Sequence, residues 1–167
     1  MGLRGTVIVV ILACSLPAAR SQAADCTQPA GPGVDWQRCF FDDRDLSGHD
    51  LSHAHLRGAS FARAKMNGAK LAGVSAFDAK FIGTAMAGAT LDGGAFAEAD
   101  FTKADLAGAS LKSADLRRAH FFKANLRGAD LTGALTQGAD LTNADLSGAL
   151  WTDGHRVCAE GSLGDCN

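Results

Sequence analysis

The densest group of potential metal ligands in the chain is a set of three histidines in its first third. His49, His53 and His55 lie within seven residues of one another, with Asp50 among them. Imidazole nitrogens and carboxylate oxygens are usual ligands of zinc, so these side chains could bind a metal if the fold turned them toward one point. Whether it does so depends on the structural elements that position them.

Those elements are units of five residues repeated without interruption. A bulky residue, which we call the centre of its unit, falls at every fifth position from Trp36 to Trp151, and this gives 24 units. The centres are twelve Leu, six Phe, two Met, two Trp, Ala76 and Thr136. Two residues before the centre is the inner position, which is Ala in 17 units. Two residues after it is the corner position, which is Gly in 12 units.

Neither an α-helix nor a flat strand can use a period of five. Five residues turn a helix by about 500°, so successive centres would lie about 140° apart and no apolar stripe would form. Along a strand they would alternate between the two faces. The spacing is satisfied if the chain turns a corner in each unit, so that centre and inner residue both point into a solenoid. Gly at the corner position favours a backbone with positive φ.

The units Ala114-Asp115-Leu116-Arg117-Arg118 and Ala139-Asp140-Leu141-Thr142-Asn143 resemble those of the pentapeptide-repeat family. The resemblance covers residues 34–153 and implies an all-β fold, a right-handed quadrilateral parallel β-helix with four units in each coil. The 24 units would then make about six coils. The sequence supports four sides independently, because centres 20 residues apart would stack. Five of the six Phe centres fall in one such column, at positions 41, 61, 81, 101 and 121.

In this register the three histidines do not converge. His49 occupies an inner position, His53 a corner and His55 the next side, so we expect no metal site. Arg44 also occupies an inner position, and a guanidinium that points inward would need a carboxylate partner such as a neighbouring aspartate.

The register offers no other catalytic arrangement. Asp100 and His120 would lie on adjacent coils of one side and could pair there. No Ser or Cys is placed beside a His and a carboxylate as a catalytic triad requires, and the glycines follow the repeat instead of forming a phosphate-binding motif. We therefore expect no enzyme, no catalytic residue and no cofactor.

Residues 1–23 have the features of a secretory signal peptide. Arg4 precedes an apolar run, Thr6–Ala13, which is too short to span a membrane, and small residues favour cleavage after Ala23. One rival interpretation treats Ile11–Cys14 as a lipobox, with Cys14 lipidated and the protein anchored as a lipoprotein. Another treats the segment as a buried N-terminal helix. We expect export to the periplasm or the extracellular space, with no transmembrane segment in the mature chain.

The remaining four cysteines suggest two disulfides in an exported protein. Cys26 and Cys39 lie near the N-terminal end of the repeats, and Cys158 and Cys166 follow their C-terminal end. The sequence alone allows three pairings. The rod that the resemblance implies has ends much further apart than two bridged Cα atoms, which leaves Cys26 with Cys39 and Cys158 with Cys166. The same separation argues against a single four-cysteine zinc site.

The expected organisation has four parts: a signal peptide over 1–23, an irregular lead-in over 24–33, the β-helix over 34–153 and a C-terminal cap over 154–167. The lead-in is rich in Pro and Gly. The cap is indicated by the register, which fails after Trp151, where Gly154 and Arg156 occupy the next inward positions. A solenoid must cover its apolar ends, and we expect one disulfide-closed cap at each end.

Charge and exposed apolar residues indicate where a partner could bind. The mature chain has a net charge of −4 after loss of Arg4 and Arg20, which argues against direct binding of nucleic acid. One corner column nevertheless contains three basic residues, and apolar residues point outward nearby, two of them flanking one corner, Phe77 and Ile82. The candidate interaction surface comprises Arg63, Lys103, Lys123, Phe77, Ile82 and Phe122.

We expect a non-catalytic exported scaffold, a monomer or homodimer, that presents a rigid surface to a protein or envelope partner. Some members of the family protect DNA gyrase by resembling acidic duplex DNA, which gives the alternative of a nucleic-acid mimic. The chain departs from that group in its export signal, its weak net acidity and its basic clusters.

Overall fold

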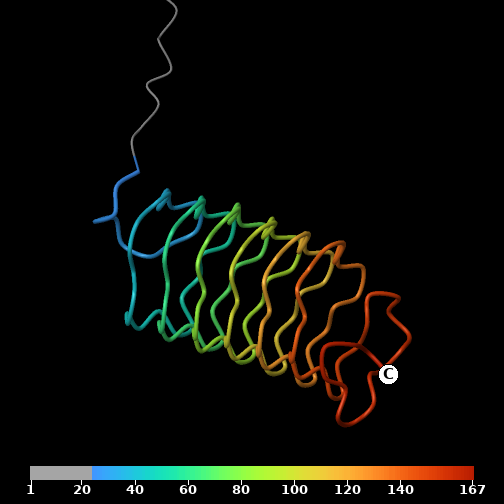
Figure 1. Cartoon of the computed structure of the whole chain (residues 1–167). Helices are drawn as coiled ribbons and strands as arrows, with labels where there is room; N and C mark the ends of the chain where they lie inside the picture. Colours follow the sequence, from blue (N-terminus) through green and yellow to red (C-terminus); the bar gives the residue numbers. More distant parts are fainter. Residues whose placement is uncertain (1–23) are drawn as a thin grey trace, which may run out of the picture.

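The computed structural model describes residues 24–167, so the predictions of a signal peptide, of cleavage after Ala23 and, as rivals, of lipidation at Cys14 or a buried N-terminal helix fall outside the described residues. The described chain winds through successive similar coils into a straight rod (Figure 1). The lead-in lies at one end of this rod and the C-terminal segment at the other (Figure 1).

Each coil returns to the same position after 20 residues. Parallel β-bridges join residues 20 apart along the rod, from Asp35 with His55 to Asp130 with Leu150. The Ser60 amide, for example, donates to the carbonyl oxygen of Cys39 in the preceding coil at 2.8 Å. This register confirms the period of 20 that the column of Phe centres predicted.

Each side of a coil contributes one bridged residue, and residues 24–167 contain no α-helix and no strand longer than a single bridge. The reason is the corner, which recurs every five residues and ends the extended backbone before a second residue can pair. All corner positions from 38 to 148 have positive φ. Eleven of them are not Gly and still adopt φ values of 54–60°, so the stacking of coils imposes this geometry even where the residue disfavours it.

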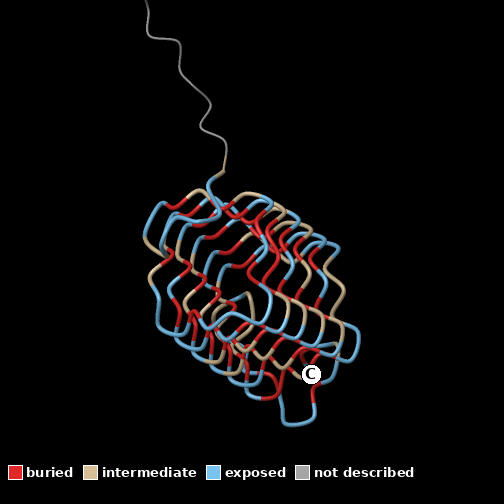
Figure 2. Ribbon diagram, turned by 90° about the vertical axis from the view of Figure 1, so that its left-hand side faces the viewer, coloured by how far each residue is buried: buried red, intermediate tan, exposed pale blue. Residues whose placement is uncertain are grey.

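Stacked aromatic rings fill one side of the interior. Phe61, Phe81, Phe101 and Phe121 are buried, and their ring centroids are 4.9–5.3 Å apart with interplanar angles of 4–7°. Figure 2 shows buried residues along the inner sides of the coils and exposed residues around the outside. The predicted column of Phe centres is thus a continuous stack along the rod.

A glycine at one inner position makes room for the sixth Phe centre. Phe96 meets Phe81 edge-on, with ring centroids 6.0 Å apart. A Cβ atom on Gly94 would overlap the Phe96 ring. The inner position is therefore Gly here, where the repeat usually has Ala.

The polar residues at inner positions are accommodated in two different ways. Thr84 is buried, and its hydroxyl donates to the Phe61 carbonyl oxygen at 2.7 Å, so its hydrogen-bonding capacity is satisfied. Arg44 and His49 are exposed, and the prediction that they point inward was wrong. They belong to the first coil, and within the described residues no earlier coil covers that end of the rod, so long polar side chains can reach solvent there.

Both expected disulfides are present. Cys26 is bonded to Cys39 with Cα atoms 5.5 Å apart, and Cys158 is bonded to Cys166 with Cα atoms 4.8 Å apart. The lead-in is held further by the indole N–H of Trp36, which donates to the Gln28 carbonyl oxygen at 3.3 Å.

The C-terminal segment leaves the repeat and doubles back on the last coil. Antiparallel bridges join Asp145 with Leu163 and Leu150 with Val157, in place of the parallel bridges found elsewhere. Between Ala24 and Asn167 there is no helix long and apolar enough to cross a membrane.

Candidate interaction surface

One edge of the rod collects most of the candidate surface. Arg63, Lys103 and Lys123 occupy corner positions separated by multiples of 20 residues, so they follow one line along the stacked coils. Ile82 and Phe122 each precede a corner position of the same line. We call these five residues the basic ridge.

Phe77 belongs to a different edge. Its turn is completed by Asp78, with φ 55°, whereas the turn of Ile82 is completed by Gly83, with φ 63°. The prediction that Phe77 and Ile82 flank one corner was therefore wrong. Each unit turns its own corner, and the side formed by residues 79–81 separates the two.

The apolar side chains of this region are half-buried, and cations cover two of them. The Arg57 guanidinium lies over the Phe77 ring, 4.8 Å from its centroid. The Lys123 ammonium lies over the Phe122 ring at 5.1 Å. Such cations are attracted to the face of an aromatic ring, so a partner would meet a mixed cationic and aromatic surface here. The most exposed large apolar side chain in residues 24–167 is Phe40, at 79%, which lies in the first coil.

The positive charge available on the basic ridge belongs to its two lysines. Arg63 makes two hydrogen bonds of 2.8 Å to the Asp43 carboxylate, and an exposed pair of this kind contributes little to stability. Lys103 and Lys123 form no ion pair within residues 24–167. Two cations on adjacent coils thus remain free to attract an acidic group.

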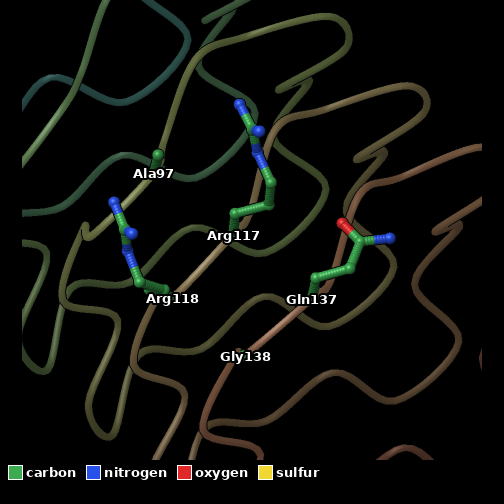
Figure 3. Close-up of a pocket in the computed structure, with 5 residues that line it drawn as sticks. All are labelled: Ala97, Arg117, Arg118, Gln137 and Gly138. Atoms are coloured by element: carbon green, nitrogen blue, oxygen red, sulfur yellow. The ribbon is translucent and has the colours of Figure 1, made fainter.

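A second basic region lies beside a pocket of about 440 Å³ (Figure 3). Arg117 and Arg118 extend alongside each other from adjacent positions (Figure 3). Arg117 pairs with Asp115 at 2.7 Å, and Arg118 pairs with Glu98 at 2.6 Å. Because both guanidinium groups are already paired, this pocket has less to offer an anion than the basic ridge.

The histidines remain apart. His49 lies at the open end of the first coil, His53 occupies a corner with φ 59° and His55 forms bridges on the next side. Within residues 24–167, no three His, Cys, Asp or Glu side chains are grouped as a metal site would require. His120 lies between Asp100 and Asp140 in the ladder of bridges, which makes it a neighbour of Asp100 as the register predicted.

Aspartates one residue before the centre stabilise the turns. The Asp45 carboxylate accepts a hydrogen bond of 3.1 Å from the Ser47 amide, and the Asp140 carboxylate accepts one of 3.0 Å from the Thr142 amide. The same bond recurs in seven further units, at Asp35, Asp50, Asp100, Asp105, Asp115, Asp130 and Asp145. A short side chain that accepts from the amide two residues later explains why the repeat favours Asp or Asn there.

These hydrogen bonds predict a loss of stability in acid. The Ser47 side chain and, second to it, the Ser47 amide lower the pKa of Asp45 below its ordinary value of 3.8, and the side chain and amide of Thr142 do the same, in that order, for the pKa of Asp140. The unfolded chain therefore takes up protons at a higher pH than the folded chain. The stability that these groups contribute is present above the unfolded-state pKa and is lost as the pH falls through the folded-state pKa.

We expect the urea midpoint of unfolding to be clearly lower at about pH 3 than at about pH 5. Circular dichroism or tryptophan fluorescence would measure both midpoints. A midpoint that is equal or higher at the lower pH would contradict this account of the aspartates.

A four-sided solenoid of five-residue units, with a bulky centre, usually an Ala two residues before it and often an Asp directly before it, defines a class of protein, the pentapeptide-repeat β-helices. The family model for pentapeptide repeats matches eight copies, over residues 41–76, 79–118, 96–135 and 124–150. The chain belongs to the pentapeptide-repeat family. No curated protein sequence matches the chain.

The solved structures that are similar to this chain include HetL and QnrB1. HetL, a pentapeptide-repeat protein involved in the regulation of heterocyst differentiation in the cyanobacterium Nostoc sp. strain PCC 7120, is 29% identical with a TM-score of 0.55, over 73% of this chain and 63% of HetL. QnrB1, a plasmid-mediated fluoroquinolone resistance protein, is 24% identical with a TM-score of 0.54, over 73% of this chain and 65% of QnrB1. The chain thus spans less than two thirds of either relative. Both comparisons imply a right-handed quadrilateral β-helix.

Proposed function

We propose that the protein is a non-catalytic exported scaffold that presents the basic ridge to an acidic partner, either a protein or a surface of the cell envelope. The observation that carries this proposal is the pair of lysines, Lys103 and Lys123, which stand on adjacent coils without an ion pair in the described chain. Half-buried Ile82 and Phe122 lie on the same edge. Because the coils fix the positions of these residues, little backbone entropy is lost when a partner binds.

Export is supported by the cysteines. Disulfides form and persist mainly in oxidising compartments, and each end of the described chain contains one. We propose a mature protein of about six coils, preceded by the lead-in over 24–33 and closed by the C-terminal cap over 154–167. In this arrangement the two disulfides fasten the segments that cover the ends of the apolar interior. A monomer and a homodimer are both compatible with the proposal.

Mimicry of nucleic acid is the alternative function. The likeness to QnrB1, at 24% identity, concerns the fold alone. A mimic of duplex DNA needs continuous rows of negative charge, since the duplex has a phosphate charge about every 1.7 Å. On the side of the rod that contains Asp100 and Asp140, the row is interrupted by Lys80 and His120. This interruption favours the scaffold over the mimic.

Charge reversal on the basic ridge tests the scaffold function. We expect the purified protein to co-sediment with the envelope fraction of its own cells, and Lys103→Glu/Lys123→Glu to reduce the bound fraction at least about threefold, because both unpaired cations are lost. Arg38→Glu/Lys70→Glu is the matched control, since it makes the same change in net charge away from the ridge at two residues that also form no ion pair within residues 24–167. Equal binding by the ridge variant and the wild type, or equal loss in the control, would reject the ridge as the docking surface.

A further inference from the structure

The N-terminal end of the rod contains a pocket of about 470 Å³ that the proposed scaffold function does not use. The lead-in forms one wall, and the first coil forms the rest. Trp36, Phe41 and Leu46 provide its apolar lining, while Arg44 and His49 also border it. A pocket of this size can hold a small organic molecule.

The two basic residues at the pocket are departures from the repeat. Arg44 and His49 occupy inner positions, and the inner residues of the next coil in the same two columns are Ala64 and Ala69. The column of Arg44 continues as Thr84, Ala104, Ala124 and Ala144, and that of His49 continues as Ala89, Ala109, Ala129 and Ala149. Both departures fall in the one coil whose inner side chains reach an open end, and both side chains border the same pocket.

The apolar lining suits a flat or short-chain hydrocarbon group. The rings of Trp36 and Phe41 lie against each other, with centroids 4.0 Å apart and planes inclined by 35°. Leu46 continues the lining on the next side. Trp36, Phe41 and Leu46 are only 2%, 8% and 7% exposed, so an aromatic or aliphatic body of a ligand would meet their edges at the pocket, and an edge-on approach of rings is favourable.

The charged side chains at the rim of the pocket favour a ligand with a single negative charge. Arg44 forms no ion pair within residues 24–167, and a guanidinium binds a carboxylate through two parallel hydrogen bonds. The His49 Nδ1 atom is 3.2 Å from the Ser47 carbonyl oxygen, which holds the ring at the rim. Asp45 also borders the pocket, with its carboxylate engaged by the Ser47 amide, and its charge disfavours a ligand with two negative charges.

We propose that this pocket is a binding site for a small organic acid that has an apolar body and a single carboxylate. The carboxylate pairs with the Arg44 guanidinium, and the apolar body rests on Trp36, Phe41 and Leu46. The site is distinct from the basic ridge, so its occupation and the docking of a partner can be measured separately.

The test uses the purified protein with both disulfides formed and 4-phenylbutyrate as the probe. Calorimetry should give saturable binding with a Kd of about 0.1–1 mM, and the neutral analogue 4-phenylbutanamide should bind at least about tenfold more weakly because it cannot form the charged pair. In nitrogen–proton NMR spectra the indole signal of Trp36 should shift with the probe. The indole signal of Trp151, at the other end of the rod, should stay in place.

Two variants locate the site. Arg44→Ala introduces the residue that occupies the same column in the next coil, Ala64, so the variant should fold normally. It should bind the probe at least about tenfold more weakly. Arg38→Gly removes the same charge from a corner of the same coil, where φ is 58° and Gly is suited to the backbone, and should leave binding unchanged.

Three outcomes would overturn the proposal. These are no saturable binding at about 10 mM probe, equal binding by Arg44→Ala and the wild type, and an equal loss in Arg38→Gly. Light scattering on Arg44→Ala/His49→Ala identifies the competing role of these residues. Suppose that the wild type is monomeric and does not bind the probe, and that this variant associates. The two side chains would then serve to keep the ends of neighbouring rods apart, as charges on exposed sheet edges do.

Discussion

Phe81→Ala should destabilise the protein by about 3–5 kcal/mol, as for other fully buried Phe residues. The Phe81 ring is stacked between Phe61, at a centroid distance of 5.3 Å, and Phe101, at 4.9 Å. Its removal leaves a cavity in the middle of the rod, where fixed coils on both sides limit collapse. Urea unfolding followed by circular dichroism would measure the change in the free energy of unfolding.

Phe40→Ala is the matched control for that experiment. The same atoms are deleted, but the Phe40 side chain is 79% exposed, so we expect a cost below about 0.5 kcal/mol. Phe77→Ala should cost below about 1 kcal/mol, because the ring is only half-buried and exposed Arg57 lies over it. Similar losses for Phe81→Ala and Phe40→Ala would show that the assignment of inward and outward positions is incorrect.

Reduction of the two disulfides should loosen both ends of the rod and leave its middle intact. The bridges close loops of 13 and 8 residues, and loops of this length correspond to stabilisation of about 2–3 kcal/mol each. In a solenoid each coil contacts only its neighbours. Hydrogen exchange should therefore increase in residues 24–45 and 145–167 after reduction, while the amides of the central coils stay protected.

The same preparation tests export. We expect native protein to begin near Ala24, to contain no free thiol, and to yield peptides that link Cys26 with Cys39 and Cys158 with Cys166. These disulfides require an oxidising compartment. Free thiols in a protein that retains Met1 would count against the exported scaffold and favour a cytoplasmic binding partner. Uniform loss of protection after reduction would instead contradict the independence of the end segments.

Much of the architecture was predictable because the repeat encodes it locally. A centre at every fifth residue is incompatible with a helix or a flat strand, and the recurrence of Phe at intervals of 20 residues indicated four sides. The Phe column, the corners with positive φ and the neighbouring positions of Asp100 and His120 all follow from that register, as the structure confirms. Once a rod is assumed, the disulfide pairing also follows, because only one arrangement keeps each bridge at one end.

The tertiary structure decided what happens where the repeat stops or departs from its pattern. The register alone placed Arg44 and His49 in the interior, but their coil has no described coil before it, so both side chains reach solvent and border a pocket. Likewise, counting positions placed Phe77 and Ile82 at one corner, whereas the backbone turns separately after each. Which cations remain unpaired, as Lys103 and Lys123 do in the described chain, depends on the carboxylates that the fold brings near them, four of which pair with cations 18 or 20 residues away on adjacent coils. A pattern of five residues specifies the inside of this rod because every unit meets the same surroundings there. It does not specify the ends and the outer surface, where the surroundings differ from unit to unit.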